Sequence, residues 1–394
     1  MHARHLFIGL ALLSLGCDGS TTMDAAVPDG ASMDSGQRDT GDSSVTPMDT
    51  PSSDVPTDAP SPLYRVLTGQ GDNVIVTFEL SDAGELTELG RTSVSGGPSF
   101  LDVARGGREG AVVLEGTGQI VMLSLAAGTG VVTELGERRG SEGGGPTHVS
   151  IDRSGRWAML ANYGGGTIAV FPFQRGVGLG TSSDTAAPGM RSHQILTTPS
   201  NDWVLVPCLG ANHVATLAFD DAAGTFEDSS ALDTAAGAGP RHVAIASDGR
   251  TVYLTNELNS TVQVLGLDET TGVLTARSTV SSLPSGFSGS NTTAEIALHP
   301  NGRVLYVSNR GHDSIAVFAI EDDGTLTPIG HALLMARTPR SFAVDPSGRF
   351  LLAGAQNDDE IVRFAIAADG SLTRLGTTST TGAPTFVGIF EVAR

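Results

Sequence analysis

The side chains best suited to chemistry in this sequence are histidines and glutamates that recur at one position of a repeated motif. The motif begins seven times, at residues 98, 146, 191, 240, 293, 339 and 384. Its third residue reads, in chain order, Phe100, His148, His193, His242, Glu295, Ser341 and Phe386. A position that served only the fold would be expected to keep one type of residue in every copy. The four consecutive ionisable groups therefore indicate a functional site.

Further charged residues accompany this position. Arg241 directly precedes His242, while Glu257 and Arg310 each follow an asparagine later in their copies. Arginine binds carboxylate or phosphate groups through paired hydrogen bonds and stabilises an oxyanion. A histidine or glutamate with a tuned pKa activates water and protonates a leaving alkoxide, so these residue types suit a hydrolysis or ring opening without a metal. We predict catalytic roles for His148, His193, His242, Glu257 and Glu295, and substrate binding by Arg241, Arg310, Asn256 and Asn309.

Some of these assignments have competing explanations. Asparagine often caps turns by bonding to nearby backbone, so a structural role competes with substrate binding at Asn256 and Asn309. The histidines and carboxylates could instead bind a divalent ion, but no short ligand spacing supports this, and we expect neither a metal nor another cofactor. Cys208 lies at the place of Asn256 in its own copy. No base can be assigned to it, so we do not expect a nucleophile there.

The segments that must position these residues alternate between apolar and polar side chains. One copy contains four such runs, at 242–246, 251–255, 261–265 and 273–276. A period of two is the signature of β-strands. Asp-Gly, Ser-Gly or Asn-Gly separates the first two runs in several copies, as tight hairpins require. Copies follow one another every 45 to 53 residues, and four strands in a repeat of this length predict the blade of a β-propeller.

The two ends of the repeat region are incomplete in complementary ways. Residues 64–94 supply three strands without a first one, and residues 384–392 supply only a first strand. Combined in one blade, they leave no open sheet edge. We therefore predict an all-β fold for residues 63–394, a seven-bladed β-propeller of four-stranded blades closed by its N- and C-terminal strands. The start of each innermost strand and the end of each second strand then meet at one open mouth of the central channel, where we expect little packing.

Several segments resemble the bacterial lactonase family of seven-bladed propellers, which includes a 6-phosphogluconolactonase and fungal carboxy-muconate cyclases. They are Pro146 to Ser150, Ala161 to Gly164, Gly239 to His242, Asn256 to Ser260 and Ser308 to Ile315. The resemblance covers nearly all of residues 63–394. It implies that the same histidine, arginine and glutamate side chains open a sugar lactone or another small lactone. The alternative is a non-catalytic propeller of the cell envelope that binds a ligand or a protein.

The chain departs from the family pattern in its third blade. Arg191-Ser192-His193 stands where the family usually has His-x-His, and Cys208 and Asn212 replace two aspartates. If those aspartates orient a histidine or an arginine, catalysis here is weaker or is directed at another substrate.

Residues 1–17 have the organisation of an export signal. Arg4 precedes an apolar run from Leu6 to Leu15, which is too short to span a bilayer. Leu13 to Cys17 resembles a bacterial lipobox, so we expect Cys17 to be lipidated and to anchor the protein to a membrane. An ordinary cleaved signal is the alternative. Either reading predicts an exported protein of the cell envelope.

Residues 18–62 have the composition of an acidic disordered linker. They contain nine Asp, six Pro and one Arg, with no Leu, Ile or aromatic residue, too little apolar surface to offset the entropy of folding. The whole chain has no lysine and a formal charge of −20, which excludes lysine nucleophiles and argues against a nucleic-acid partner. We expect a monomer whose partners are a small lactone and, through the lipid, a membrane.

Overall fold

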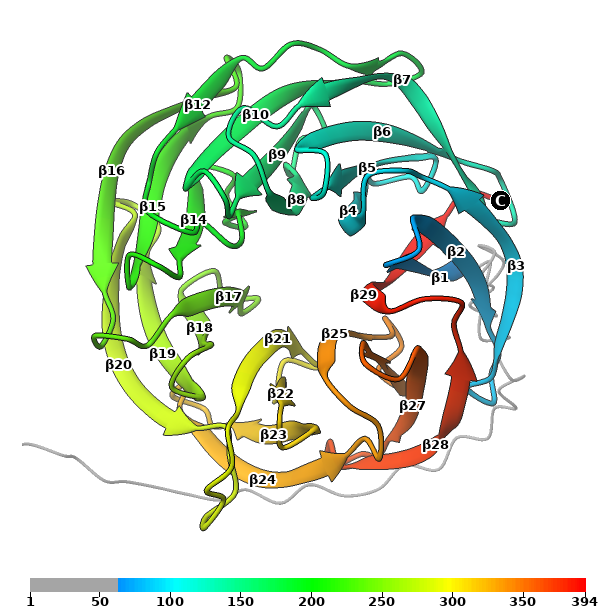
Figure 1. The fold of residues 1–394 in the computed structure, drawn as a ribbon. Coiled ribbons are helices and arrows are strands. Elements are labelled where there is room, and N and C mark those ends of the chain that lie inside the picture. The colour runs from blue at the N-terminus through cyan, green and yellow to red at the C-terminus, as the bar shows by residue number, and fades with distance from the viewer. Residues whose placement is uncertain (1–62) are drawn as a thin grey trace, which may run out of the picture. The chain divides into compact units, whose positions relative to one another are not determined.

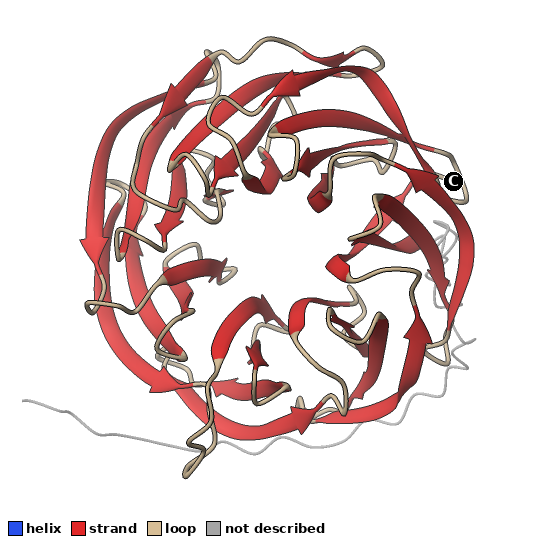
Figure 2. Cartoon of the chain, viewed as in Figure 1, coloured by secondary structure: helices blue, strands red, loops and turns tan. Residues whose placement is uncertain are grey.

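The computed structural model describes residues 63–394, which form strands, turns and loops and contain no helix (Figure 2). Since these residues contain no helix, none of them forms a membrane-spanning helix. The predicted export signal, the lipidation site at Cys17 and the linker of residues 18–62 lie outside the described residues. The all-β prediction is confirmed for the remainder.

Six sheets each use strands that follow one another in the sequence, from the centre of the ring outward (Figure 1). The first contains β4 (Pro98–Val103), β5 (Glu109–Leu114), β6 (Gln119–Leu125) and β7 (Val132–Gly140). The second contains β8 (Pro146–Ile151), β9 (Trp157–Asn162) and β10 (Thr167–Gln174), with the short β11 (Gly178–Leu179) and β12 (Asp184–Ala186) in place of one outer strand. The third contains β13 (Leu196–Thr197), β14 (Trp203–Cys208), β15 (His213–Asp220) and β16 (Thr225–Asp233).

The next three sheets are more regular. The fourth contains β17 (Pro240–Ile245), β18 (Thr251–Asn256), β19 (Thr261–Asp268) and β20 (Val273–Ser281). The fifth contains β21 (Thr292–Leu298), β22 (Val304–Arg310), β23 (Ser314–Ile320) and β24 (Leu326–Leu333). The sixth contains β25 (Pro339–Val344), β26 (Phe350–Ala355), β27 (Glu360–Ile366) and β28 (Leu372–Ser379). The prediction of four-stranded blades is confirmed, apart from the divided outer strand of the second blade.

The seventh blade joins the two ends of the described chain. Its strands are β29 (Pro384–Val392), β1 (Leu63–Gln70), β2 (Val74–Leu80) and β3 (Leu86–Ser93), in that order from the centre. Leu67 lies opposite Gly388 in the antiparallel β1–β29 pair, where the blue and red ends of the ribbon meet in Figure 1. The predicted closure by a shared blade is confirmed.

The hydrophobic core is divided among the spaces between neighbouring blades. Val113 of the first blade packs in one cluster with Leu160 and Phe171 of the second, all fully buried. Tyr306 of the fifth blade packs similarly with Leu351 of the sixth. Burial of each such side chain contributes about 1.5–3 kcal/mol. The blades are thereby held at fixed positions around the channel, and so are the residues on their innermost strands.

The innermost strands share an irregularity at the start of the motif. On β17, Pro240 lies opposite Asn256 and His242 lies opposite Thr255, so Arg241 between them has no partner on β18. The same shift occurs on β4, β8 and β25. Such a β-bulge re-aims side chains that would otherwise alternate between the two faces of a strand. It allows two successive residues, Arg241 and His242, to face the channel.

Candidate active site

Three histidines of successive blades converge in the channel: His148 on β8, His193 just before β13, and His242 on β17. The His242 ring centroid lies 5.6 Å from that of His148 and 5.0 Å from that of His193. Phe100 of the first blade contacts the same group, with its ring centroid 4.1 Å from that of His148. The convergence expected from the motif position is therefore confirmed, and we call these three histidines the histidine cluster.

The expectation of an open mouth with little packing is wrong for this cluster. His242 is 2% exposed, Arg241 3% and His148 4%. The bulged strands direct these side chains toward one another across a narrow channel, and Phe100 packs against them. Replacing any of them therefore removes packing as well as a chemical group.

Glu295 positions His242 for proton transfer. The Nδ1 atom of His242 lies 2.8 Å from Oε1 of Glu295, and the backbone N–H of Ile296 donates to the same oxygen over 3.1 Å. The Nε2 atom of His242 is buried and has no hydrogen-bond partner among the described residues. A carboxylate that accepts from Nδ1–H leaves Nε2 as the acceptor, which is the tautomer of a general base.

Burial and charge set the protonation of this pair. Burial, together with Arg241 and Arg340, lowers the pKa of His242 although the Glu295 carboxylate opposes them. Burial alone would raise the pKa of Glu295, but His242 and Arg241 outweigh it and hold that pKa below its ordinary value. At neutral pH the pair consists of a neutral imidazole and an ionised carboxylate.

Glu257 links the two predicted arginines. Its Oε2 atom lies 3.0 Å from Nε of Arg241 and 3.1 Å from Nη2 of Arg310. The Arg241 contact is an ion pair without hydrogen-bond geometry, and this side chain donates instead to the carbonyl of Ala294, as Arg310 does to that of Thr293. Burial and the nearby Arg310 lower the pKa of Arg241 to about 9 although Glu257 opposes them. Both guanidinium groups are thus charged at neutral pH and share a single carboxylate.

The other two histidines are neutral and differ in position. Burial, reinforced by nearby positive charge, lowers the pKa of both His148 and His193 well below the ordinary value. His193 and His242 line a small space of about 10 Å³ together with Arg241 and Arg340, and this volume is about what one water molecule needs. His148 faces a separate, larger cavity instead. The catalytic roles of the three histidines stay predictions. Because His193 and His242 share the space beside the arginines and His148 does not, the geometry favours His242 and His193 as the catalytic histidines.

The predicted asparagines are bonded within the blades. Nδ2 of Asn256 donates to Oγ1 of Thr261 over 3.0 Å. Nδ2 of Asn309 donates to the carbonyl of Ser282, whose hydroxyl donates back to Oδ1 of Asn309. Both asparagine side chains are buried. These contacts favour the structural alternative for Asn309. Oδ1 of Asn256 is buried without a hydrogen-bond partner among the described residues, so substrate binding by Asn256 stays a prediction.

The departures in the third blade have structural consequences. Cys208 is a buried free thiol next to Ser192, and burial raises its pKa to about 11, which is unsuited to a nucleophile. Arg191 adopts a positive φ of 57° and its guanidinium lies 5.5 Å from the ring centroid of Tyr163. The Tyr163 ring in turn lies 5.5 Å from that of His193. The Arg191 guanidinium over the Tyr163 ring thus lies near His193.

Sequence analysis missed Arg340 and Tyr163 as residues of the site. Arg340 lines the small space beside His242 and lies 4.0 Å from Glu115. It occupies the same motif position as Arg241, directly after a proline, and this signal could have identified it. Tyr163 follows Asn162 at the end of β9, as Glu257 follows Asn256 at the end of β18, so the same comparison of copies could have found it.

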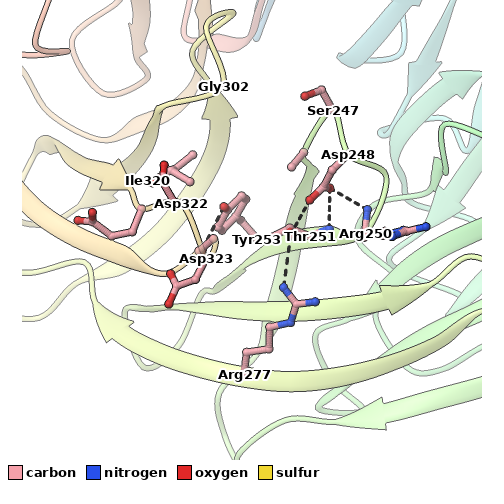
Figure 3. Close-up of a pocket in the computed structure, with 13 residues that line it drawn as sticks. Ser247, Asp248, Arg250, Thr251, Tyr253, Arg277, Gly302, Ile320, Asp322 and Asp323 are labelled. Atoms are coloured by element: carbon pink, nitrogen blue, oxygen red, sulfur yellow. Dashed lines mark hydrogen bonds between the residues drawn. The ribbon is translucent and has the colours of Figure 1, made fainter. Parts of the chain in front are cut away.

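Another polar cavity, of about 340 Å³, lies between the fourth and fifth blades and contains none of the predicted site residues (Figure 3). Asp248 accepts hydrogen bonds from the backbone N–H groups of Arg250 and Thr251 and from the Thr251 hydroxyl. Tyr253 donates to the carbonyl of Gly324. Because these polar groups hydrogen-bond to one another, they need no ligand. The cavity follows from the packing of hairpins of two neighbouring blades.

Comparison with protein families gives a match over most of the described chain. The family described as "Lactonase, 7-bladed beta-propeller" matches residues 66–389. Among curated relatives, the 6-phosphogluconolactonase of Serratia proteamaculans is 36% identical over 141 residues, which is 35% of this chain and 43% of the relative. That of Pectobacterium carotovorum is 37% identical over 144 residues, 35% of this chain and 42% of the relative. The aligned part thus spans about two fifths of the length of these relatives.

Solved structures extend the similarity to the whole propeller. A putative 6-phosphogluconolactonase from Bacteroides fragilis superposes with a TM-score of 0.76 at 25% identity, covering 85% of this chain and 99% of the other. The periplasmic gluconolactonase PpgL of Pseudomonas aeruginosa superposes with a TM-score of 0.77 at 27% identity, covering 84% of this chain and 99% of the other.

Proposed function

The chain belongs to the lactonase family of seven-bladed β-propellers, and on this premise we propose that it hydrolyses a small lactone at the end of the channel where Arg241, His242 and Glu257 lie. The observation that carries the proposal is the His242–Glu295 pair. Its nitrogen Nε2 is unpartnered and buried, and His242 lines the same small space as Arg241 and Arg340. A base and two cations around a space for about one water molecule are what activation of that water for ester hydrolysis requires.

His242 acts as the general base and then as the general acid. Its Nε2 takes a proton from water while the water oxygen bonds to the lactone carbonyl carbon. The tetrahedral intermediate collapses by breaking the ring C–O bond, and the imidazolium returns its proton to the departing alkoxide. The products are a carboxylic acid and a hydroxyl group on one open chain. Glu295 holds the ring of His242 and stabilises its charged form during this cycle.

The arginines stabilise the negative charge that develops in the reaction. Arg241 is fixed by Glu257 and by the Ala294 carbonyl, so its guanidinium needs no reorganisation when an oxyanion forms. With Arg310 and Arg340 it makes this end of the channel favourable for an anionic substrate. The curated relatives are named 6-phosphogluconolactonases, which act on a phosphorylated sugar lactone. We propose an aldonolactone that carries a phosphate or a carboxylate.

We also propose that the protein is an exported, lipid-anchored monomer of the cell envelope. The support is the arrangement of Arg4, the apolar run Leu6 to Leu15 and Cys17. One similar solved structure is described as a periplasmic gluconolactonase, which is consistent with a lactone substrate outside the cytoplasm. The departures at Arg191, Cys208 and Asn212 are consistent with an anionic aldonolactone other than 6-phosphogluconolactone.

The test is lactone opening by the purified protein and by His242→Asn. Asparagine keeps a nitrogen donor for Glu295 and removes Nε2. We expect opening of 6-phosphogluconolactone or another anionic aldonolactone above the spontaneous rate, and a fall in kcat of about 100-fold or more in the variant. His299→Asn is the matched control, because His299 lies outside the channel and bonds to the carbonyl of Gly348.

Two outcomes would contradict this proposal. No turnover above the spontaneous rate by the parent protein, across aldonolactones and acyl lactones, would favour the non-catalytic propeller. Full activity of His242→Asn would place the chemistry elsewhere.

A further inference from the structure

The channel contains a second cavity on the far side of the histidine cluster. It has a volume of about 350 Å³ and follows the innermost strands beyond the third motif residue, toward Leu101, Val149 and Val387. Phe100 and Glu295 line both this cavity and the small space beside His242. The histidine cluster therefore separates two compartments of the channel, and we call the larger one the lower cavity.

Small residues make room for the lower cavity. The fifth motif residue is Ala297 in the fifth blade, Ala343 in the sixth and Gly388 in the seventh, and all three line it. Aromatic rings form one side: the Phe386 centroid lies 4.5 Å from that of Phe100 and 6.2 Å from that of Phe390. The size falls in the range of small-molecule sites, which are mostly apolar with a few placed polar groups.

Asp102 is the polar group placed beside these rings. It occupies the fifth motif position of the first blade and lines the lower cavity. Its two oxygens accept one hydrogen bond each, from the backbone N–H groups of Val103 and Ile151, both over 2.8 Å. A carboxylate oxygen can accept more than one such bond. Within residues 63–394 Asp102 forms no ion pair, and no arginine lines the cavity.

A polar atom without a partner lies at the end of the lower cavity next to the histidine cluster. His148 is 4% exposed and lines the lower cavity, and its buried Nδ1 atom has no hydrogen-bond partner among the described residues. Buried polar atoms are normally paired. Asp102 and His148 thus both have hydrogen-bonding capacity that the protein does not use.

We propose that the lower cavity binds an organic ammonium ion with an apolar body. The ammonium pairs with Asp102, and the body packs among Phe100, Phe386 and Phe390. The faces of aromatic rings attract cations, and Asp102 has no ion-pair partner among the described residues, because Arg153 acts on it only from beyond ion-pair distance. An anion would meet the negative charges of Asp102 and Glu295. This site does not depend on the proposed lactonase activity, because its test measures binding and not turnover.

The test is calorimetric titration of the whole protein with three probes of equal chain length: hexylammonium, hexan-1-ol and hexanoate. We expect hexylammonium to bind at least 10-fold more tightly than hexanol, and hexanoate not to bind at millimolar concentration. Asp102→Asn is expected to remove the 10-fold preference and leave hexanol binding unchanged. Asp72→Asn, an exposed aspartate outside the cavity, changes the net charge equally and is expected to keep the preference.

Two further measurements do not depend on the folding of Asp102→Asn. Ala343→Leu fills the lower cavity and is expected to abolish binding of both hexylammonium and hexanol. In the parent protein, hexylammonium affinity is expected to fall as pH drops through about 6, because burial raises the pKa of Asp102 to about 6 against the opposing effect of its two N–H donors and of Arg153. The other titratable groups on the cavity wall, neutral His148 and ionised Glu295, have pKa values below their ordinary ones.

Equal affinity for hexylammonium and hexanol in the parent protein would overturn the proposal. So would unchanged hexylammonium binding in either Asp102→Asn or Ala343→Leu. Failure of the lactonase proposal leaves these outcomes unaffected, since none of them uses a lactone.

Discussion

Glu257→Gln is the substitution that most directly tests the charge arrangement of the proposed active site. Gln has nearly the same size, but it carries no charge, and its amide nitrogen cannot accept a hydrogen bond. Oε2 of Glu257 lies 3.0 Å from Arg241 and 3.1 Å from Arg310. The variant therefore leaves the buried Arg241 and the partly exposed Arg310 without the carboxylate that they share.

The expected loss of stability follows from the burial of this group. Removing one partner of a buried ion pair costs about 3–5 kcal/mol, because the remaining charge is left uncompensated. The Glu257 side chain is 17% exposed and that of Arg241 3%, so the lower end of about 3 kcal/mol applies. With an unfolding entropy of about 2 cal/mol/K per residue, this loss lowers the Tm of a domain of this size by about 4 °C.

Thermal unfolding followed by circular dichroism measures this change, and Glu115→Gln provides the matched control. Glu115 lies near the same end of the channel, 4.0 Å from Arg340, but its side chain is 44% exposed. Exposed pairs of this kind contribute about 0–1 kcal/mol, so the control is expected to melt within about 1 °C of the parent. Lactone turnover is expected to fall in Glu257→Gln and to persist in Glu115→Gln.

A Glu257→Gln variant that melts within a degree of Glu115→Gln would refute this reasoning. It would mean that Arg241 and Arg310 are compensated by other groups, and that Glu257 does not hold them in place.

Three further predictions concern proton transfer, ring closure and anchoring. Because the pKa of His242 lies below 6.5, kcat/KM is expected to fall only when the pH drops below that value. In Glu295→Gln this fall is expected at still lower pH, because the carboxylate that raises the pKa of His242 is gone. A shift to higher pH would contradict the assigned His242–Glu295 pair. Deleting residues 384–394, which include all of β29, is expected to lower the Tm by many degrees. Deleting only residues 393–394 removes the two backbone hydrogen bonds of Ala393 and is expected to lower the Tm by only about 3 °C. Equal melting of the two truncated proteins would show that β29 does not close the ring. Cys17→Ser is expected to move the protein from the membrane to the soluble fraction on cell fractionation, and unchanged partition would reject lipidation at Cys17.

The architecture was accessible from the sequence because its signals are local. Alternation of apolar and polar residues over 242–246 and 251–255 specifies two strands, and Asp248-Gly249 specifies the hairpin between them. The motif occurs seven times, so the same strand assignment applies to each copy. The incomplete copies at residues 64–94 and 384–392 also required a shared blade, because an unpaired strand edge is unfavourable.

The convergence of the ionisable side chains was also predictable. His148, His193 and His242 occupy one motif position on successive blades, and the symmetry of a propeller brings equivalent positions to the same level of the channel. Comparing the copies in the same way would have identified Arg340 as well.

What only the tertiary structure decided was the direction and surroundings of each side chain. The bulge that turns both Arg241 and His242 into the channel depends on pairing with β18, and no pattern within the motif reveals it. Burial of the histidine cluster depends on how closely seven blades approach one another. The same approach places His148 on the wall of the lower cavity and His242 on the other side. Such contacts join residues about 50 positions apart in the sequence, so they follow from packing between blades and not from the local preferences that the sequence displays.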